Sequence, residues 1–523
     1  MPTIFQDRCG ISLYDAQHST GAIAPIPPST IEETLAALLC FQRTCQDFGV
    51  HDSNVRVVAT EATRTALNRD ELLSRIRDRT GWDVQLLAKE EEGRLGAMGI
   101  ASSVAHLDGL CMDMGGGSVQ LTWATKKPDG DINMGPSVSL PYGAAALMSR
   151  LSSLTSTEES QYHAEIASKI QTVLENDLQI PMSRWNSAKN GAGITLYLSG
   201  GGFRGWGHIL MSQESVQPYP IRIVNGYTVL SAHFFSALDL DPAEIAAFRV
   251  SSRRASQVPA VQALITAIQR ARLPISQVTF VQGGVREGLL YSELPPSIRA
   301  QNSLITATSP YAPHSSTLLS RLLQDAVPYP LEPELLEATV NLLYIHSPLP
   351  KDVRADAALR CSTTGLLAGA LGLTHRDRSL VALILCERWG GDVSAVEAQF
   401  LAALQTLCGT LEWWTRFVGR MAKGVADMFP AGVVRNEQIV KVQTGFPSGQ
   451  DFSSADRCWV KITAFRSEIA HMVKAWANGL EKLGKKKNWV KGKGGLKVDV
   501  TVSIDTSITQ VEDNKLSENE TGR

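Results

Sequence analysis

The sequence contains no long uninterrupted apolar run. No stretch of its 523 residues is apolar enough over sufficient length to span a bilayer. The first residues are not followed by the basic and then apolar segment that is typical of a secretory signal. We therefore expect a cytoplasmic protein that has no membrane partner.

Cysteine pairs of the kind that bind zinc are also absent. The eight cysteines include no Cys-x-x-Cys pair, and the nearest neighbours, Cys40 and Cys45, have no histidine cluster beside them. This pattern is typical of reduced thiols in the core of a cytosolic protein. The formal net charge is only −2, so no overall field would recruit nucleic acid, and no direct DNA binding is expected.

The chain does have enough apolar residues for several domains. Hydrophobic residues make up 44% of the sequence, which is enough for packed cores. A chain of 523 residues is long enough for two to four domains. Strand and helix patterns alternate through residues 1–107 and again through 108–305, which predicts two α/β blocks. Residues 306–505 predict a mostly helical domain that ends in one strand at 498–504, and the polar tail 506–523 predicts disorder.

Two segments of the helical block bear on its packing. Residues 355–371 carry helical spacing and predict one helix. The pair Trp413-Trp414 suits either an exposed anchor for a partner protein or two buried aromatic side chains.

A glycine-rich segment at 113–118 (DMGGGS) lies between two strand patterns. Glycines permit a tight turn whose bare N–H groups an anion can approach, and Asp113 at the strand end could hold a cation against that anion. The segment therefore predicts either a phosphate-and-magnesium loop or a plain hairpin turn. The candidate phosphate ligands are Gly115, Gly116, Gly117 and Ser118.

A second glycine cluster follows the strand pattern at 194–199. The segment 200–205 (GGGFRG) matches the dinucleotide fingerprint G-x-G-x-x-G, but the acidic residue expected about 20 positions later is absent. We therefore reject NAD binding. A phosphate-binding turn at a helix N-terminus remains, with Gly200, Gly201 and Gly202 as its candidates.

Four segments together resemble the exopolyphosphatase/guanosine-pentaphosphate phosphohydrolase (Ppx/GppA) family. They occur in family order at 59–68 (ATEATRTALN), 91–95 (EEGRL), 113–121 (DMGGGSVQL) and 282–288 (QGGVREG). The resemblance implies a two-lobed actin-like or sugar-kinase-like (ribonuclease H-like) fold. The family normally begins with a strand and an Asp-x-Gly-Ser-Asn phosphate loop, and the absence of both implies a truncated first lobe.

The resemblance also implies roles for individual residues. Glu92 matches a carboxylate that activates the attacking water, Arg64 matches a basic residue that meets phosphate, and Asp113 matches the acid that positions Mg²⁺. Each has a structural alternative, because Glu92 could be one of three solvated glutamates at a helix start and Arg64 a plain surface residue. Gln120 replaces a glutamate of the family, and a neutral amide is a poorer ligand for Mg²⁺ than a carboxylate.

A narrower resemblance points to a regulatory branch of this superfamily. It rests on the segments 7–13 (DRCGISL), 199–207 (SGGGFRGWG), 219–221 (YPI) and 385–391 (LCERWGG). These resemble fungal regulators that signal mitochondrial status to nuclear transcription. Two functions follow: a regulator that binds a phosphate-rich small molecule (polyphosphate, ATP or guanosine phosphates) and a partner protein, or an active Mg²⁺-dependent exopolyphosphatase or guanosine-pentaphosphate phosphohydrolase.

Overall fold

The structure is a computed structural model with two compact units. It describes residues 3–18, 23–239, 257–328, 331–435, 439–450, 454–490 and 494–505. The first unit contains Thr3–Glu214 and Val224–Gln301, and the second contains Ser215–Ile223 and the chain from Asn302 onward. The tail 506–523, for which the sequence predicts disorder, lies outside the described residues.

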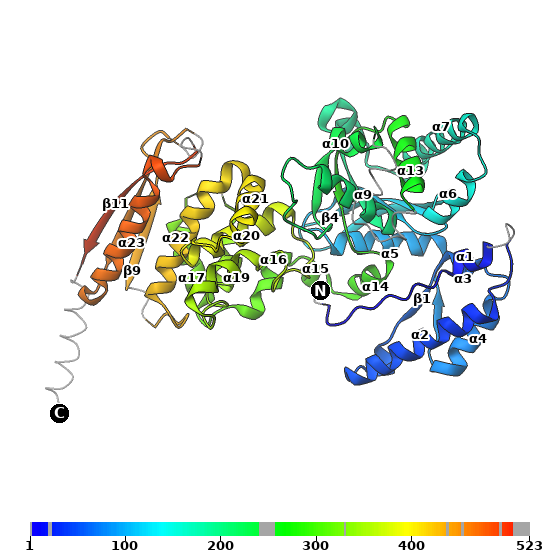
Figure 1. Cartoon of the computed structure of the whole chain (residues 1–523), viewed down its shortest axis with the longest axis horizontal. Helices are drawn as coiled ribbons and strands as arrows, with labels where there is room; N and C mark the ends of the chain where they lie inside the picture. Colours follow the sequence, from blue (N-terminus) through cyan, green and yellow to red (C-terminus); the bar gives the residue numbers. More distant parts are fainter. Residues whose placement is uncertain are drawn as a thin grey trace. The chain divides into compact units, whose positions relative to one another are not determined.

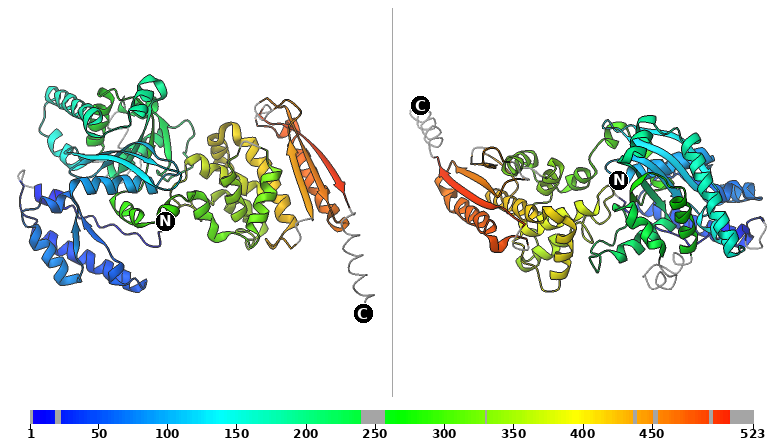
Figure 2. Two further views of the ribbon diagram at one scale, coloured as in Figure 1. Left: turned by 180° about the vertical axis from the view of Figure 1, so that it is seen from behind. Right: turned by 90° about the horizontal axis from the view of Figure 1, so that it is seen from above.

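The first unit begins with a small α/β layer. Strands β1 (Val57–Ala59) and β2 (Val84–Leu86) pair in parallel and form a two-stranded sheet. Helices α2 (Pro28–Asp47) and α4 (Arg69–Thr80) pack together beside it, as the blue helices of Figures 1 and 2 show. Ile31 and Leu35 of α2 and Leu72 and Ile76 of α4 share one core with Ile26 and Ala66.

A six-stranded mixed sheet forms the centre of the first unit. Its spatial order is β5-β4-β3-β6-β8-β7, in which β3, β6 and β8 are parallel neighbours and the other pairs are antiparallel. The strands are β3 (Asp108–Met114), β4 (Val119–Lys126), β5 (Ile132–Leu140), β6 (Ile194–Gly200), β7 (Tyr227–Leu230) and β8 (Ile275–Phe280).

Helices cover both faces of this sheet (Figure 1). Helices α5 (Lys89–Ser102) and α14 (Val285–Glu293) share a core with Cys111 and Tyr197 on one face. Successive strand residues point to opposite faces, so Asp113 lies on the same face as Cys111. On the other face, α9 (Gly201–Gln213) packs against α13 (Val258–Arg270).

The described part of the first unit contains further helices. They are α1 (Leu13–His18), η1 (Asp52–Asn54), α3 (Glu61–Arg64), α6 (Ala144–Leu151), α7 (Ser156–Thr172), η2 (Val173–Asp177), α8 (Met182–Ser187), η3 (Ala188–Ala192), α10 (Ser231–Ser236), η4 (Ala237–Asp239) and α15 (Pro296–Arg299).

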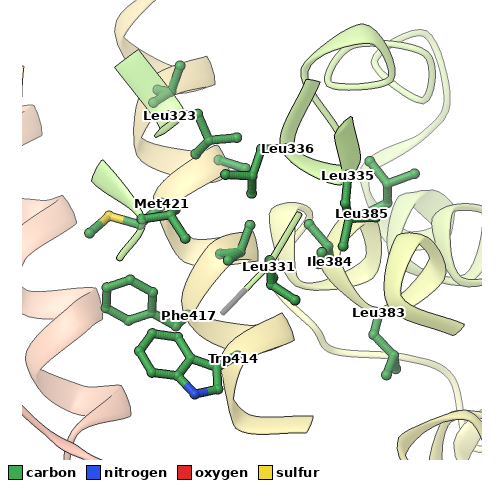
Figure 3. Close-up of a cluster of buried hydrophobic side chains, with 14 of the residues drawn as sticks. Leu323, Leu331, Leu335, Leu336, Leu383, Ile384, Leu385, Trp414, Phe417 and Met421 are labelled. Carbon is green, nitrogen blue, oxygen red and sulfur yellow. The ribbon is translucent and has the colours of Figure 1, made fainter. Parts of the chain in front are cut away.

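The second unit is largely helical, and its helices share one core. Trp413 and Trp414 are 2% and 4% exposed and lie in this core, so they are buried aromatics and not an exposed anchor. Figure 3 shows Trp414, Phe417 and Met421 among leucines of the neighbouring helices. The helices are α16 (Ser303–Thr308), η5 (Ser309–Tyr311), α17 (Ser316–Ala326), α18 (Pro333–Asn341), η6 (Lys351–Val353), α19 (Arg354–Arg360), α20 (His375–Arg388), α21 (Ala398–Cys408), η7 (Gly409–Leu411) and α22 (Glu412–Met428).

The end of the second unit corrects the expectation of a single closing strand. Three strands form a sheet in the order β11-β10-β9, with β10 and β11 parallel. Helix α23 packs on this sheet, which Figure 2 shows in orange and red. Alternate residues of β10 are buried, so one face of the sheet joins the core. The elements are β9 (Val440–Gly445), β10 (Arg457–Ala464), η8 (Ser467–Ile469), α23 (Ala470–Leu483), η9 (Lys486–Asn488) and β11 (Lys497–Ile504).

The helix predicted over residues 355–371 is wrong beyond Arg360. Helix α19 ends there, and the chain continues in turns that include Gly365. The buried guanidinium of Arg378 donates hydrogen bonds to the carbonyls of Ser362, Leu367 and Ala370. These bonds satisfy carbonyl groups that a continued helix would have used internally.

A short segment from the middle of the sequence belongs to the second unit. Within Ser215–Ile223, the hydroxyl of Tyr219 lies 2.7 Å from Nδ1 of His375. Nε2 of His375 lies 2.7 Å from the carbonyl oxygen of Ile223. The imidazole is buried, so both contacts satisfy polar atoms that water would not reach.

These arrangements confirm the predicted fold class of layered α/β sheets followed by a largely helical region. Over the described ranges, no helix combines the length and apolar character that crossing a membrane requires.

Candidate phosphate-binding site

The first glycine loop connects β3 to β4 and is fixed by the start of α6. The backbone N–H groups of Gly143, Ala144 and Ala145 donate to the carbonyls of Gly117, Gly115 and Gly116, at 3.2, 3.0 and 2.8 Å. The loop carbonyls therefore point toward α6. Within the described residues, the N–H groups of 116–118 have no protein acceptor, and a row of such donors is an anion-binding arrangement.

Gly143 makes this packing possible. A Cβ atom at Gly143 would lie 2.5 Å from the carbonyl carbon of Gly116 and would also overlap the backbone at Gly117 and Ser118. Any side chain would therefore push the loop away from α6. Gly143 could not be predicted from the sequence, because a single glycine between Tyr142 and Ala144 carries no local signal of such a contact.

Asp113 lies at the end of β3, directly before the loop. Its Oδ2 would be 3.3 Å from a Cβ at Gly96 of α5, which shows how closely this helix covers the carboxylate. Burial raises the pKa of Asp113 to about 6, while the positive charge of Arg204 acts in the opposite direction. Asp113 is therefore beside the glycine loop, where the sequence predicts it.

Gln120 lies opposite Asp113 in the antiparallel β3–β4 pair. Its Nε2 donates to Oγ of Ser118 at 3.1 Å. Its Oε1 is buried and has no hydrogen-bond partner in the part of the chain that the structure describes. An unsatisfied oxygen beside a carboxylate and a hydroxyl is compatible with a Mg²⁺ ion, which prefers oxygen ligands.

The donor set alone is nevertheless small. Among the described residues, no group of three or more His, Cys, Asp or Glu side chains is arranged to hold a metal ion. Mg²⁺ usually keeps several waters and binds through one or two carboxylates together with substrate phosphates. The residues present therefore fit a magnesium–phosphate ligand better than a free ion.

Arg64 and Glu92 form a partly buried ion pair. Nη1 of Arg64 lies 3.1 Å from Oε2 of Glu92 and 2.6 Å from the carbonyl oxygen of Leu87. Burial raises the pKa of Glu92, and the ion pair with Arg64 opposes this shift. Glu92 is 8% exposed, so it is not a solvated glutamate of the helix start, and the Arg64 side chain is 16% exposed.

Glu61 also lies at the loop, although its position in the sequence does not indicate this. Its Oε2 would lie 2.5 Å from a Cβ at Gly117, and the ring of Tyr14 would lie 2.9 Å away on the same glycine. Burial raises the pKa values of Tyr14 and Glu92, and the charge of Glu61 adds to both shifts. A carboxylate therefore lies against the 115–118 loop.

The second glycine cluster lies where the neighbouring strand β6 ends and α9 begins. Gly200 has φ of +110° and pairs with Met114, the residue before the first loop. A Cβ at Gly202 would lie 2.6 Å from Cγ2 of Val261, so Gly202 allows the start of α9 to pack closely against α13, whereas a Cβ at Gly201 would meet no atom within 4 Å. Arg204 lies in the first turn and donates from Nε to the carbonyl of Gly200 at 3.4 Å. Both glycine clusters therefore lie at the same end of adjacent parallel strands.

A cavity of about 440 Å³ reaches the first loop. Its polar end contains Glu61, Glu92 and Gly115–Ser118, and its apolar side is formed by β1, α2 and α4. The cavity therefore combines the free N–H groups with the candidate base in one space. It does not include Gly200–Gly202.

Comparison with known proteins extends these observations. Residues 302–507 match the RTG2 C-terminal domain. Retrograde regulation protein 2 of Saccharomyces cerevisiae is 37% identical over 462 residues, which cover 83% of this chain and 78% of that protein.

Solved structures of similar proteins cover about half of the chain. The Ppx/GppA family member of Aquifex aeolicus is 23% identical and covers 54% of this chain and 86% of that chain, with a TM-score of 0.41. An exopolyphosphatase of Cytophaga hutchinsonii is 20% identical, and the match covers 53% of this chain and 86% of the exopolyphosphatase chain, with a TM-score of 0.41. Residues 1–297 match the Ppx/GppA phosphatase family, and together with the yeast relative this shows that the chain belongs to that family.

Proposed function

We propose that this protein is a regulator that binds a phosphate-rich small molecule at the 115–118 loop. Polyphosphate, ATP and guanosine phosphates are the candidate ligands. The observation that carries the proposal is the loop backbone: the start of α6 binds its carbonyls, while the N–H groups of 116–118 remain available. Oriented backbone donors favour anions without requiring a side chain.

The surroundings of the loop favour binding over rapid hydrolysis. Phosphoryl transfer depends on a cation and on donors that neutralise developing charge. Gln120 brings a neutral amide where a carboxylate would strengthen a cation site, and Glu61 adds negative charge beside the loop. Mg²⁺, when bound with a phosphate ligand, would supply charge neutralisation; Asp113, Ser118 and Oε1 of Gln120 are the groups that would hold it.

A second candidate function is hydrolysis of phosphoanhydrides. Glu92 favours it, because a buried carboxylate with a raised pKa is suited to accept a proton from an attacking water. Arg64 would orient this carboxylate and add positive charge near the phosphate. In this mechanism the loop N–H groups would stabilise the charge that develops on the transferred group.

The regulatory part of the proposal rests on the yeast relative, whose name concerns retrograde regulation. We propose a cytoplasmic role in mitochondria-to-nucleus signalling, in which a partner protein responds to the ligand-bound state. The match of residues 302–507 to the RTG2 C-terminal domain supports this assignment.

Calorimetric titration of the full chain with short polyphosphate, ATP and guanosine pentaphosphate, each with Mg²⁺, tests the binding proposal. Gly116→Pro removes one loop N–H. The matched variant Gly116→Ala keeps that N–H and adds a methyl group where no atom lies within 4 Å. We expect binding by the wild type and a loss of about tenfold or more in Gly116→Pro alone, since one charge-assisted hydrogen bond contributes about 1.5–3 kcal/mol.

Phosphate release from the same ligands separates the two functions. Release that disappears in Glu92→Gln would support a hydrolase. Binding without release would support a regulator, and absence of both binding and release would refute both functions.

A further inference from the structure

A polar cavity in the second unit lies apart from the 115–118 loop. It has a volume of about 210 Å³ and lies where the end of α20 meets α21 and α22. The polar side chains that line it are Glu387, Asp392, Gln405, Thr415, Arg416 and Arg420. The first of these belongs to the segment 385–391, which the proposed phosphate site does not use.

Glu387 is the buried negative charge of this cavity. The residue is 8% exposed, and its Oε1 forms an ion pair with Nε of Arg420. Burial raises the pKa of Glu387, and the positive charge of Arg420 opposes this shift. The charge of Glu387 is therefore balanced by one guanidinium group.

Arg416 adds a second guanidinium group to the same cavity. It precedes Arg420 by one helical turn on α22, so both side chains lie on one face of the helix. Its Nη1 donates to the carbonyl oxygen of Asn488 at 2.6 Å, which is a neutral acceptor. Within the described ranges Arg416 lies within ion-pair distance of no carboxylate, although its charge, like that of the exposed Asp392, acts on Glu387 from further away.

Glycines give the cavity its shape. Gly390 and Gly391 have φ of +110° and +77°, which side-chain-bearing residues rarely adopt. A Cβ at Gly391 would collide with the carboxylate of Glu387, and a Cβ at Gly419 would lie 2.5 Å from Cβ of Glu387. The turn and the close contact between α20 and α22 thus place this carboxylate beside α22.

We propose that this cavity binds a small anion that carries a carboxylate or phosphate group, with Arg416 and Arg420 as its ligands. The cavity is lined by two guanidinium groups and two carboxylates, of which Arg420 and Glu387 pair with each other and Asp392 is exposed to solvent. The guanidinium of Arg416 is therefore the group that remains for a bound anion. Guanidinium groups bind carboxylates and phosphates through paired N–H donors. The cavity is smaller than the roughly 300–1,000 Å³ of sites for drug-sized ligands, so it suits a metabolite of a few carbon atoms.

The test is calorimetric titration of the full chain with succinate and, separately, with inorganic phosphate. Arg416→Gln removes the unpaired charge, and Arg416→Lys keeps a charge and a donor for the Asn488 carbonyl. Lys423→Gln is the matched control, because Lys423 lies on the same helix but pairs with Asp427 outside the cavity. We expect at least a tenfold loss of affinity in Arg416→Gln, a smaller loss in Arg416→Lys, and none in Lys423→Gln.

The Gly116→Pro variant separates this site from the first. Anion binding that Gly116→Pro retains and Arg416→Gln loses would support the cavity, and the tighter of the two probes would identify a carboxylate or a phosphate ligand. The proposal would be overturned if neither probe bound, if Gly116→Pro alone lost binding, or if both folded Arg416 variants bound as the wild type does. The melting temperature of each unliganded variant shows whether it is folded.

Discussion

Gln120 lies directly opposite Asp113 across the β3–β4 pair, and its buried Oε1 has no hydrogen-bond partner among the described residues. An acid and an amide therefore occupy the positions from which two side chains can reach one ion beside the glycine loop. Since carboxylates are the stronger ligands for Mg²⁺, the proposed cation binding should depend on which side chain stands opposite Asp113.

Gln120→Glu should strengthen Mg²⁺ binding in the presence of a phosphate ligand, on the order of tenfold, because it adds a carboxylate opposite Asp113. Titration with Mg²⁺ at a fixed concentration of ATP would measure this change. Gln120→Met, which has a similar size and no strong ligand atom, is the control. Equal Mg²⁺ affinity in Gln120→Glu and Gln120→Met would show that this position does not contact the ion.

Glu61→Gln should increase the affinity for polyphosphate by about tenfold, since it removes a negative charge that lies against Gly117. A gain of about 1.4 kcal/mol corresponds to this factor. Calorimetry at low and high salt would measure it, and the gain should shrink at high salt. Glu71→Gln, a change on α4 outside the cavity, should leave the affinity unchanged. Weaker binding in Glu61→Gln would mean that this carboxylate helps to hold the ligand.

Gly143→Ala should lower the free energy of unfolding by roughly 1–3 kcal/mol, because its Cβ would overlap the backbone of the glycine loop. The same displacement should weaken anion binding. Urea denaturation followed by phosphate titration would measure both effects. Gly116→Ala is the control, because it adds a methyl group in open space. A Gly143→Ala protein with wild-type stability would contradict the packing described for α6.

The raised pKa of Asp113 predicts a specific dependence of stability on pH. Asp113 has a pKa of about 6 in the folded protein, whereas the usual pKa of an aspartate is 3.8. The folded protein therefore keeps the carboxyl proton to a higher pH than the unfolded chain does. Protonation of Asp113 therefore stabilises the folded protein fully below pH 3.8, and this stabilisation is lost as the pH rises to about 6. Glu92, whose pKa is also raised, acts in the same direction.

Asp113→Asn tests this dependence by removing the ionisable group. The variant should be more stable than the wild type at pH 7.5, because it avoids burying a charge, and this difference should shrink toward pH 4. Urea denaturation at the two pH values would measure it. A difference that is constant with pH would indicate that Asp113 titrates near its usual value. Mg²⁺ binding by the wild type should weaken below about pH 6, since protonation removes the ligand charge.

The local parts of the site could be predicted from the sequence, whereas the contacts between distant segments could not. Asp113 and Gly115–Gly117 are contiguous, and the turn that joins their strands follows from glycine alone. Gly143 and Glu61 reach the same loop through the packing of α6 and α3, which no spacing along the chain encodes. Their roles become visible only when the loop carbonyls and the Gly117 surface are placed in space.

The same limit applies to the second unit. Helical spacing continues past Arg360, but the buried Arg378 binds the carbonyls of the following turns and so stabilises a non-helical path. In β9 and β10 buried and exposed residues alternate, with Lys441 and Lys461 at exposed positions, but this pattern does not show that β10 pairs with both β9 and β11. The helix and strand propensities of these segments therefore predict neither the hydrogen bonds of Arg378 nor the pairing of the strands.

The inclusion of Ser215–Ile223 in the second unit makes both units discontinuous in sequence. The backbone passes from one unit to the other three times, so a single proteolytic cut at any one passage leaves the two units covalently joined. A fragment that begins at Asn302 would leave Tyr219 and the Ile223 carbonyl behind, and the imidazole of His375 would lose its contacts with these two groups. An unsatisfied buried polar group costs about 1–3 kcal/mol, so the helical half of this protein should depend for its stability on nine residues encoded in the middle of the other half.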